Sequence, residues 1–333
     1  MMKKIVSLLL ALTLALALTA CGGEKKPDTP AADPADINLY VLAGPTGIGA
    51  VNLRARAEAG EALSNRYHVT MTGANDEVVA AISNGQADIA CVATNLAATL
   101  YNKTDGGVRV LAVNTLGVLS ILANGTEALD SISDLKGETI YSPGQGANPE
   151  YILRYVLEGN GLDPDKDVTI RFVGEGSELL TVWQTEPQAF IMAPQPVATT
   201  LLMQNEYAEK IVDMTQAWDN VSGGSSTLMM GCVIVRTAFL DEHPEAVKSF
   251  LTDYAASIEA AQTDLEGTAA LCEQYGIIPK AALAMKAIPQ CGLTFVSGAE
   301  MKKQLSGYLT VMFEANPKSV GGKLPADDFY YGA

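Results

Sequence analysis

Residues 37–53, with the sequence INLYVLAGPTGIGAVNL, decide the fold. Apolar residues alternate over the first part of this stretch, which predicts a β-strand, and Gly44-Pro45-Thr46-Gly47 predicts a tight turn. Beyond the turn, apolar residues recur at three- and four-residue steps and predict a helix with one face packed on a sheet. They are Ile48, Val51, Ala55, Ala59 and Ala62. The stretch therefore predicts one strand–turn–helix unit of an α/β fold.

The turn at 44–47 is a candidate ligand site. Glycine lets the backbone approach a bound molecule closely, and the free amides at a helix N-terminus attract polar groups. A dinucleotide site is disfavoured because Asn52 stands where G-x-G-x-x-G requires its third glycine, and no Lys-Ser or Lys-Thr completes a P-loop. A tight turn without a ligand is the alternative. The candidate ligand-binding residues in this wall of a small-molecule cleft are Gly44, Pro45, Thr46 and Gly47.

Residues 1–21 have the pattern of a targeting segment. Two lysines precede an unbroken apolar run that ends in Leu18-Thr19-Ala20-Cys21. This tetrapeptide resembles a bacterial lipobox, in which the cysteine thiol takes a diacylglycerol and becomes the new N-terminus. An ordinary secretory signal is the alternative. Residues 22–36 have almost nothing to bury and predict a flexible tether, so the protein is expected outside the cytoplasm, anchored to the cell membrane by lipidated Cys21.

Charge and length limit the classes of function. The net charge of −16 becomes −18 when Lys3 and Lys4 are removed, and so acidic a chain is not expected to bind nucleic acid. Roughly 300 residues follow the tether, enough for two domains with sizeable cores. No later apolar run is long enough to span a bilayer, so the lipid anchor is the one expected membrane contact.

The cysteines beyond Cys21 predict no metal site, because they form no CxxC pairs and have no histidines nearby. Cys91 and Cys232 lie in apolar strand-like runs and are expected to be buried free thiols. Cys272 and Cys291 can pair in an oxidising exterior, and the sequence leaves this disulfide open.

Three strand–helix units follow one another in the first part of the chain. Their strands are expected near 38–44, 68–73 and 87–93, and this alternation predicts a largely parallel sheet covered by helices. Asn75 is expected to cap the second helix. Ligands of open α/β sheets bind beyond the carboxyl ends of strands, so Thr94 and Asn95 are candidate ligand-binding residues. Capping of the next helix is their alternative role.

The pattern starts again after a fourth strand at 108–115 and an apolar extended run at 117–123. A loop at 142–148 matches the position of the 44–47 turn, and Pro149 is placed to open a helix. From Pro244 the chain is predicted to be mostly helical. Further strands are predicted at 136–141, 168–174, 188–193 and 210–215, and a strand at 229–240 returns the chain to the first lobe.

The chain is therefore expected to form two α/β lobes with the ligand cleft between them. Lobe 1 is predicted to contain residues 37–116 and 228–333, and lobe 2 residues 117–227. The two crossings between the lobes are the construction of a hinge. Trp218 lies near the second crossing, where its ring is a candidate to stack on a ligand. The other candidate ligand-binding residues of lobe 2 are Ser142, Gly144, Gln145, Asn148, Pro194 and Gln195.

With these motifs, the sequence resembles the substrate-binding proteins of bacterial ABC importers, in particular the branch that takes up nitrate, taurine, aliphatic sulfonates and thiamine-pyrimidine precursors. The resemblance covers nearly all of residues 37–320. It rests on the lipobox, on NGQADI at 84–89, on DLKGETI at 134–140 and on QAFIMAPQPVAT at 188–199. It implies a type II periplasmic-binding-protein-like fold that closes on a small molecule and delivers it to an ABC permease and its ATPase.

Two positions depart from the family's pattern. Phe190 stands where the family usually has an aspartate, and Gln195-Pro196 stands where it usually has Glu-Pro. No arginine falls on a predicted cleft loop, which favours a neutral or weakly charged ligand over a tightly held anion. Helix N-termini alone can hold anions, so a sulfonate, nitrate or a pyrimidine precursor all stay candidate ligands.

The sequence predicts no catalytic residues and no cofactor. His68 and His243 join no serine or cysteine nucleophile and acid in a recognisable pattern. The protein is therefore expected to be a monomeric binding protein and not an enzyme. The alternatives are a lipoprotein that senses a ligand for signalling, and a same-fold enzyme of pyrimidine-precursor synthesis, which would need a lysine in the cleft.

Overall fold

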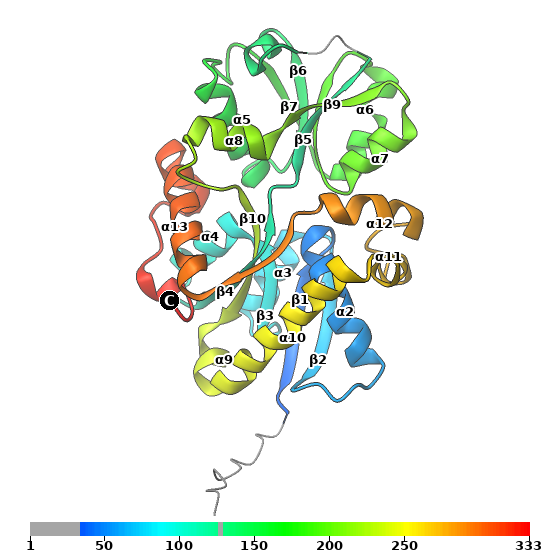
Figure 1. Cartoon of the computed structure of the whole chain (residues 1–333). Helices are drawn as coiled ribbons and strands as arrows, with labels where there is room; N and C mark the ends of the chain where they lie inside the picture. The colour runs from blue at the N-terminus through cyan, green and yellow to red at the C-terminus, as the bar shows by residue number, and fades with distance from the viewer. Residues whose placement is uncertain (1–33, 126–128) are drawn as a thin grey trace, which may run out of the picture. The chain divides into compact units, whose positions relative to one another are not determined.

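Two β-sheets organise the computed structural model, which describes residues 34–125 and 129–333 (Figure 1). The predicted signal segment 1–21, with Cys21, and residues 22–33 of the predicted tether lie outside the described residues. The tether prediction was wrong at its end, because Asp36 begins the first strand and Ala35 O accepts a hydrogen bond from Arg66 N at 2.9 Å.

The first sheet has six strands in the order β11-β4-β10-β3-β1-β2. β1 pairs in parallel with β2 and β3, whereas β10 is antiparallel to β3 and β4. The strands are β1 (Asp36–Leu42), β2 (Arg66–Thr72), β3 (Ile89–Ala93), β4 (Val108–Leu116), β10 (Met229–Arg236) and β11 (Leu293–Ser297).

The second sheet has five strands in the order β7-β6-β8-β5-β9. β6 is parallel to β7 and β8, and β5 is antiparallel to β8 and β9. The chain enters this sheet through residues 117–118 and leaves it through residues 223–228. The strands are β5 (Leu119–Asn124), β6 (Thr139–Pro143), β7 (Thr169–Val173), β8 (Phe190–Pro194) and β9 (Ala208–Asp213).

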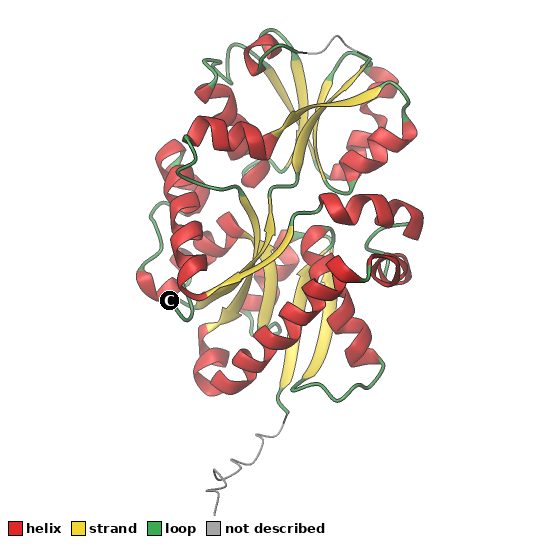
Figure 2. Ribbon diagram, in the orientation of Figure 1, coloured by secondary structure: helices red, strands yellow, loops and turns green. Residues whose placement is uncertain are grey.

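Helices cover both faces of each sheet, as Figure 2 shows. We call the first sheet with its helices the first lobe, and the second sheet with its helices the second lobe. In the described part of the chain, every helix is too short or too polar to cross a bilayer. The helices are α2 (Pro45–Glu58), α3 (Asn75–Ser83), α4 (Thr94–Lys103), α5 (Asn148–Gly159), α6 (Leu179–Thr185), α7 (Val197–Gln204), α8 (Met214–Ser222), α9 (Thr237–Glu242), α10 (Pro244–Thr263), α11 (Leu265–Gln274), α12 (Ala281–Ala287) and α13 (Gly298–Ala315). Short 3₁₀ helices occur at Ile132–Leu135, Gly176–Glu178, Ile288–Gln290, Pro317–Val320 and Asp327–Phe329.

The first sheet is buried on both faces, which explains its nearly continuous apolar strands. Cys91 lies opposite Val233, and both pack in the cluster with Phe250 and Tyr254 of α10. Their neighbours Val92 and Cys232 point to the other face, where the core cluster continues into the second lobe. The alternation of side chains along each strand therefore divides the core into two layers.

All four cysteines in the described part of the chain are free and buried. Burial raises the pKa of the Cys91, Cys272 and Cys291 thiols to about 12. Cys272 and Cys291 pack in the same apolar cluster without a disulfide. These thiols are therefore inert parts of the core at neutral pH.

Several local predictions were wrong. Ala59 and Ala62 are exposed, because α2 ends at Glu58 before Gly60, and its buried face instead contains Ile48, Val51 and Leu53. Asn75 is the first helical residue of α3 and caps nothing with its side chain.

The predicted strand 229–240 was also wrong in its second half. It ends at Arg236, where α9 begins. Strand β11 was not predicted at all, although it pairs with β4 at the edge of the first sheet.

Candidate functional site

The carboxyl ends of the parallel strands in both sheets meet the same junction between the lobes. β4 ends at Leu116, and only Gly117 and Val118 separate it from the start of β5. Because Leu119 lies opposite Pro194, β5 begins beside the carboxyl end of β8. Figure 1 shows the crossing strands between the lobes, with helix contacts between α5 and α13 on one side and between α7 and α12 on the other. This is the edge where α/β sheets bind ligands.

The turn at Gly44–Gly47 forms the start of α2. Gly44 has φ = 104°, a value that favours glycine, and it precedes Pro45 at the first helical position. A side chain at Gly47 would place its Cβ 2.7 Å from Leu42 O, so the helix can follow the strand this closely only with glycine. Thr46 Oγ1 donates to Leu42 O at 3.0 Å. No side chain caps the start of α2, which leaves its backbone amides available to a polar group.

Two predicted residues, Thr94 and Asn148, meet across the two lobes, and together with Asn95, the residue after Thr94, we call them the amide cluster. Asn148 Nδ2 donates to Thr94 Oγ1 at 3.1 Å and to the backbone oxygen of Met230 at 3.2 Å. Thr94 Oγ1 donates in turn to Met229 O at 2.6 Å. The side-chain oxygens of Asn95 and Asn148 are buried and have no hydrogen-bond partner among the described residues. Each lobe thus contributes one unpaired acceptor.

An aromatic row lies beside the amide cluster. Trp218 is fully buried, with its ring centroid 4.6 Å from that of Tyr155 and 5.3 Å from that of Tyr308. Its Nε1 donates to Ser226 Oγ at 3.3 Å. Trp218 therefore has no exposed surface for a ligand in this state, and its packing joins α8 to α13. The Tyr308 hydroxyl is buried next to Thr94, and burial raises the pKa of Tyr308.

The other candidates in the second lobe serve mostly local structure. Ser142 is buried and donates to Pro143 O at 2.9 Å. Gln195 Oε1 accepts from the hydroxyl of Thr199 at 2.7 Å and from the backbone amide of Thr199 at 3.3 Å. These bonds stabilise the first turn of α7. Gly144 and Pro194 are half-buried and Gln145 is exposed. Among the candidates of the second lobe, Asn148 hydrogen-bonds to Thr94, a candidate of the first lobe. In the part of the chain that the structure describes, Ser142, Gly144, Gln145, Pro194 and Gln195 show no hydrogen bond to a candidate of the first lobe.

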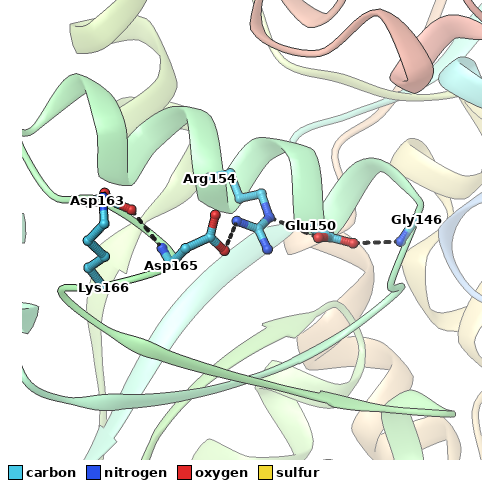
Figure 3. Close-up of polar contacts among 6 residues, drawn as sticks. All are labelled: Gly146, Glu150, Arg154, Asp163, Asp165 and Lys166. Carbon is cyan, nitrogen blue, oxygen red and sulfur yellow. Dashed lines mark hydrogen bonds and ion pairs between the residues drawn. The ribbon is translucent and has the colours of Figure 1, made fainter.

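A chain of charges fixes the loop that precedes Asn148 (Figure 3). Glu150 accepts from the backbone amide of Gly146 at 2.7 Å and from Arg154 at 2.8 Å. Arg154 also donates to Asp165 at 2.9 Å. The carboxylate thereby occupies a loop amide that would otherwise be free to bind a ligand.

Some residues at the site were missed by sequence reasoning. The oxygen of Met230 is a backbone group, so no side-chain pattern reveals it. Tyr308 comes from α13, far along the chain from the predicted loops. Asn114 is a polar residue near the carboxyl end of an apolar strand, β4, and this position is a signal that the sequence offered. Its Nδ2 donates to Tyr254 OH at 2.8 Å.

Two surface cavities lie away from this junction. One of about 410 Å³ is lined by the end of α3, the start of β4 and the end of β10, and one of about 320 Å³ by the starts of β6 and β8. Both are at the amino ends of the parallel strands. In the first, Arg236 is already bound to Asp88 Oδ1 at 2.8 Å and to Ala87 O at 2.8 Å. Within residues 34–125 and 129–333, no group of three or more His, Cys, Asp or Glu is placed to hold a metal ion.

Two mixed α/β sheets joined by two crossings, with their ligand-binding edges facing one junction, define a type II periplasmic binding protein. The family model described as "ABC transporter, phosphonate, periplasmic substrate-binding protein" matches residues 57–277, and the chain belongs to this family. It is the extracytoplasmic substrate-binding component of an ABC importer and binds a small solute. The members of this family are binding proteins and not enzymes, so the alternative of a pyrimidine-precursor synthase is discarded.

Solved structures share the fold at low sequence identity. An ABC transporter protein of Parabacteroides distasonis is 22% identical with a TM-score of 0.74, covering 88% of this chain and 98% of that one. The aliphatic sulphonate binding protein SsuA of Escherichia coli is 13% identical with a TM-score of 0.67, covering 87% and 91%. The alkanesulfonate-binding protein SsuA of Xanthomonas axonopodis pv. citri, bound to MOPS, is 14% identical with a TM-score of 0.65, covering 90% and 97%. No curated protein matches the sequence.

Proposed function

We propose that this chain is a lipid-anchored, monomeric receptor that traps its solute between the start of α2 and the amide cluster, and then passes it to a membrane permease driven by an ATPase. The observation that carries the proposal is the pair of unpaired amide oxygens, one on Asn95 of the first lobe and one on Asn148 of the second. A solute bound to both would hold the lobes together.

The cost of the unpaired acceptors supports this assignment. Asn95 is 6% exposed and Asn148 is 1% exposed. Leaving a buried acceptor without a partner costs roughly 1–3 kcal/mol, which a donor on a bound solute would recover. A solute that binds them recovers this free energy only in the closed arrangement, since the two residues belong to different lobes. Binding and closure are then one process.

The membrane anchor in this proposal rests on the sequence motif at Leu18–Cys21. Diacylglycerol on Cys21 would keep the receptor near its permease through the tether at 22–33. Metabolic labelling with an alkyne fatty acid tests this directly. We expect the label on the natural chain and not on a Cys21→Ser variant, and label that persists in the variant would contradict the anchor.

A capture experiment tests the binding site. The chain is incubated with a small-molecule extract of bacterial cells, dialysed and denatured, and the released compounds are identified by mass spectrometry. We expect the natural chain to retain a small solute and Asn148→Ala to lose it, because the variant removes the cross-lobe bonds. Asn160→Ala is the matched control, since Asn160 is the residue directly after the same helix and its side chain binds only Val156 O, at 2.7 Å. Equal retention by all three proteins would contradict the proposed site.

A further inference from the structure

The amide of Asn148 has a single possible orientation. Its Nδ2 faces the backbone oxygen of Met230 at 3.2 Å, and a carbonyl oxygen can only accept a hydrogen bond. Exchanging the nitrogen and oxygen positions would set two acceptors against each other. Asn148 Oδ1 is therefore the atom left without a partner, and it needs a donor.

Asn95 Oδ1 is a second acceptor without a partner, in the first lobe. It is buried and unpaired, and it belongs to the residue directly after Thr94, which Asn148 contacts. The hydroxyl proton of Thr94 is already given to Met229 O. The cluster thus offers two amide oxygens from opposite lobes, and neither one accepts a hydrogen bond within the described residues.

The arginines, which commonly bind anions, are occupied elsewhere. All seven arginines of the chain pair with carboxylates. In the second lobe, Asp213 accepts from the amides that start α8, Gln195 accepts from the first turn of α7, and Glu150 accepts from the loop before α5. Helix starts commonly bind anions, but at α7 and α8 the chain's own oxygens fill these positions.

We infer that the solute presents an N–H donor group, an ammonium or an amide, to Asn95 and Asn148, and that these two residues determine specificity. This inference rests on the proposed function. The uncapped start of α2 can accommodate an acceptor at the solute's other end. A group composed only of acceptors, such as a sulfonate or nitrate, would leave both amide oxygens unpaired and would face them at short range. Sites built to bond a donor reject analogues that lack it, because the buried acceptors stay unsatisfied.

Three compounds with the same two-carbon chain test the inference. Taurine carries an ammonium and a sulfonate, ethylammonium carries only the donor, and ethanesulfonate carries only the acceptors. Thermal shift and calorimetry on the full chain measure binding of each. We expect taurine to bind at least about tenfold more tightly than ethanesulfonate, and ethylammonium to stabilise the protein at high millimolar concentration. Equal or tighter binding of ethanesulfonate would overturn the inference, and so would the absence of any stabilisation by both donor compounds.

Asn95→Asp tests the inference by adding a negative charge beside the expected donor of the solute. The substitution keeps the acceptor in place and adds a negative charge, so the taurine-to-ethanesulfonate affinity ratio should rise severalfold, while Asn95→Leu should weaken taurine about tenfold or more. Asn102→Asp is the matched control. Asn102 also has an unpaired buried oxygen on α4, but its Nδ2 binds Val320 O at 2.8 Å and Lys323 O at 2.7 Å. A ratio that falls in Asn95→Asp, or that changes equally in Asn102→Asp, would contradict the assignment.

The two proposals fail in different ways. If the extract experiment captures a solute made only of acceptors, the cleft remains the binding site and only the donor requirement is wrong. If the natural chain and Asn148→Ala retain the same solute equally, the cleft itself is wrong.

Discussion

The two lobes present different chemistry at the same structural position. In the first lobe, α2 and α4 begin at the carboxyl ends of β1 and β3 without a side-chain cap. In the second lobe, the starts of α7 and α8 are sealed by the chain's own oxygens, from Gln195 and Asp213, whereas α5 begins without a side-chain cap. A common strand–turn–helix unit therefore produces one wall with uncapped starts at α2 and α4, and one wall in which two of the helix starts are already capped. The fold alone therefore does not set what a cleft binds, because the capping residues determine which backbone amides stay free.

The largest expected effect lies where the two lobes are packed together. Trp218→Ala should lower the free energy of unfolding by about 3–5 kcal/mol, because it removes a fully buried indole between Tyr155 and Tyr308. Chemical denaturation measures the loss. Hydrogen exchange should also accelerate in α13, which Trp218 joins to the second lobe.

Trp183→Ala is the control for this variant. Trp183 is 9% exposed and bonds Ala189 O within the second lobe, so its loss should destabilise the protein without accelerating exchange in α13. A change below about 1 kcal/mol in Trp218→Ala would mean that the ring is not a structural bridge, and would restore its candidacy as a ligand contact.

A smaller effect should follow from opening a sealed helix start in the second lobe. Asp213→Ala should cost about 1 kcal/mol, the usual value of an N-terminal cap, and it frees the amides of Thr215 and Gln216. Weak anion binding should then appear at α8, detected as stabilisation by sulfate that the natural chain does not show. Asp163→Ala is a suitable control, because this exposed aspartate caps no helix in the cleft. Identical sulfate responses would weaken the contrast between the lobes.

The same aspartate gives a pH prediction. Burial acts to raise the pKa of Asp213, but hydrogen bonds from Lys210 and from the amides of Gln216 and Thr215 outweigh it and hold the pKa below its ordinary value of 3.8. A lowered pKa contributes stability that is complete above about pH 4 and is lost as pH falls through the folded value. The unfolding free energy of Asp213→Asn should therefore decline less below pH 4 than that of the natural chain. Parallel curves would contradict the cap.

The smallest expected effect concerns the loop before α5. Glu150→Ala removes the hydrogen bonds to Gly146 N and Arg154. It should lower the free energy of unfolding by less than about 1 kcal/mol, since the Glu150–Arg154 pair is partly exposed. Hydrogen exchange at 144–147 should nevertheless accelerate severalfold, because the loop loses its main side-chain tether. Lys166→Ala, which breaks only the exposed pair with Asp163, should leave this exchange unchanged. Slow exchange in Glu150→Ala would show that the loop holds its form without the carboxylate.

The sequence was informative wherever the signal was local. Alternating apolar residues located β1 to within two residues at each end, and Pro149 marked the start of α5 to within one residue. The rule that ligands bind at carboxyl ends of strands selected Thr94, Asn95 and Asn148, and the structure joins Thr94 to Asn148 by a hydrogen bond. Periodicity and proline geometry act over a few residues, so they can be recognised without knowing the partner element.

Only the tertiary structure decided the rest. Strand β11 forms because Leu293 pairs with Thr115 of β4, 178 positions earlier, and Val296 pairs with Val113, 183 positions earlier. The segment itself does not differ from a loop by pattern. The burial of Trp218 depends on its packing against Tyr308. The orientation of the Asn148 amide depends on a backbone oxygen of the other lobe, that of Met230. Partners that are distant in sequence leave no local trace in the residues they contact. The chain's own order of residues thus determined where polar groups would gather, and long-range packing determined which of them stay unpaired and available to a solute.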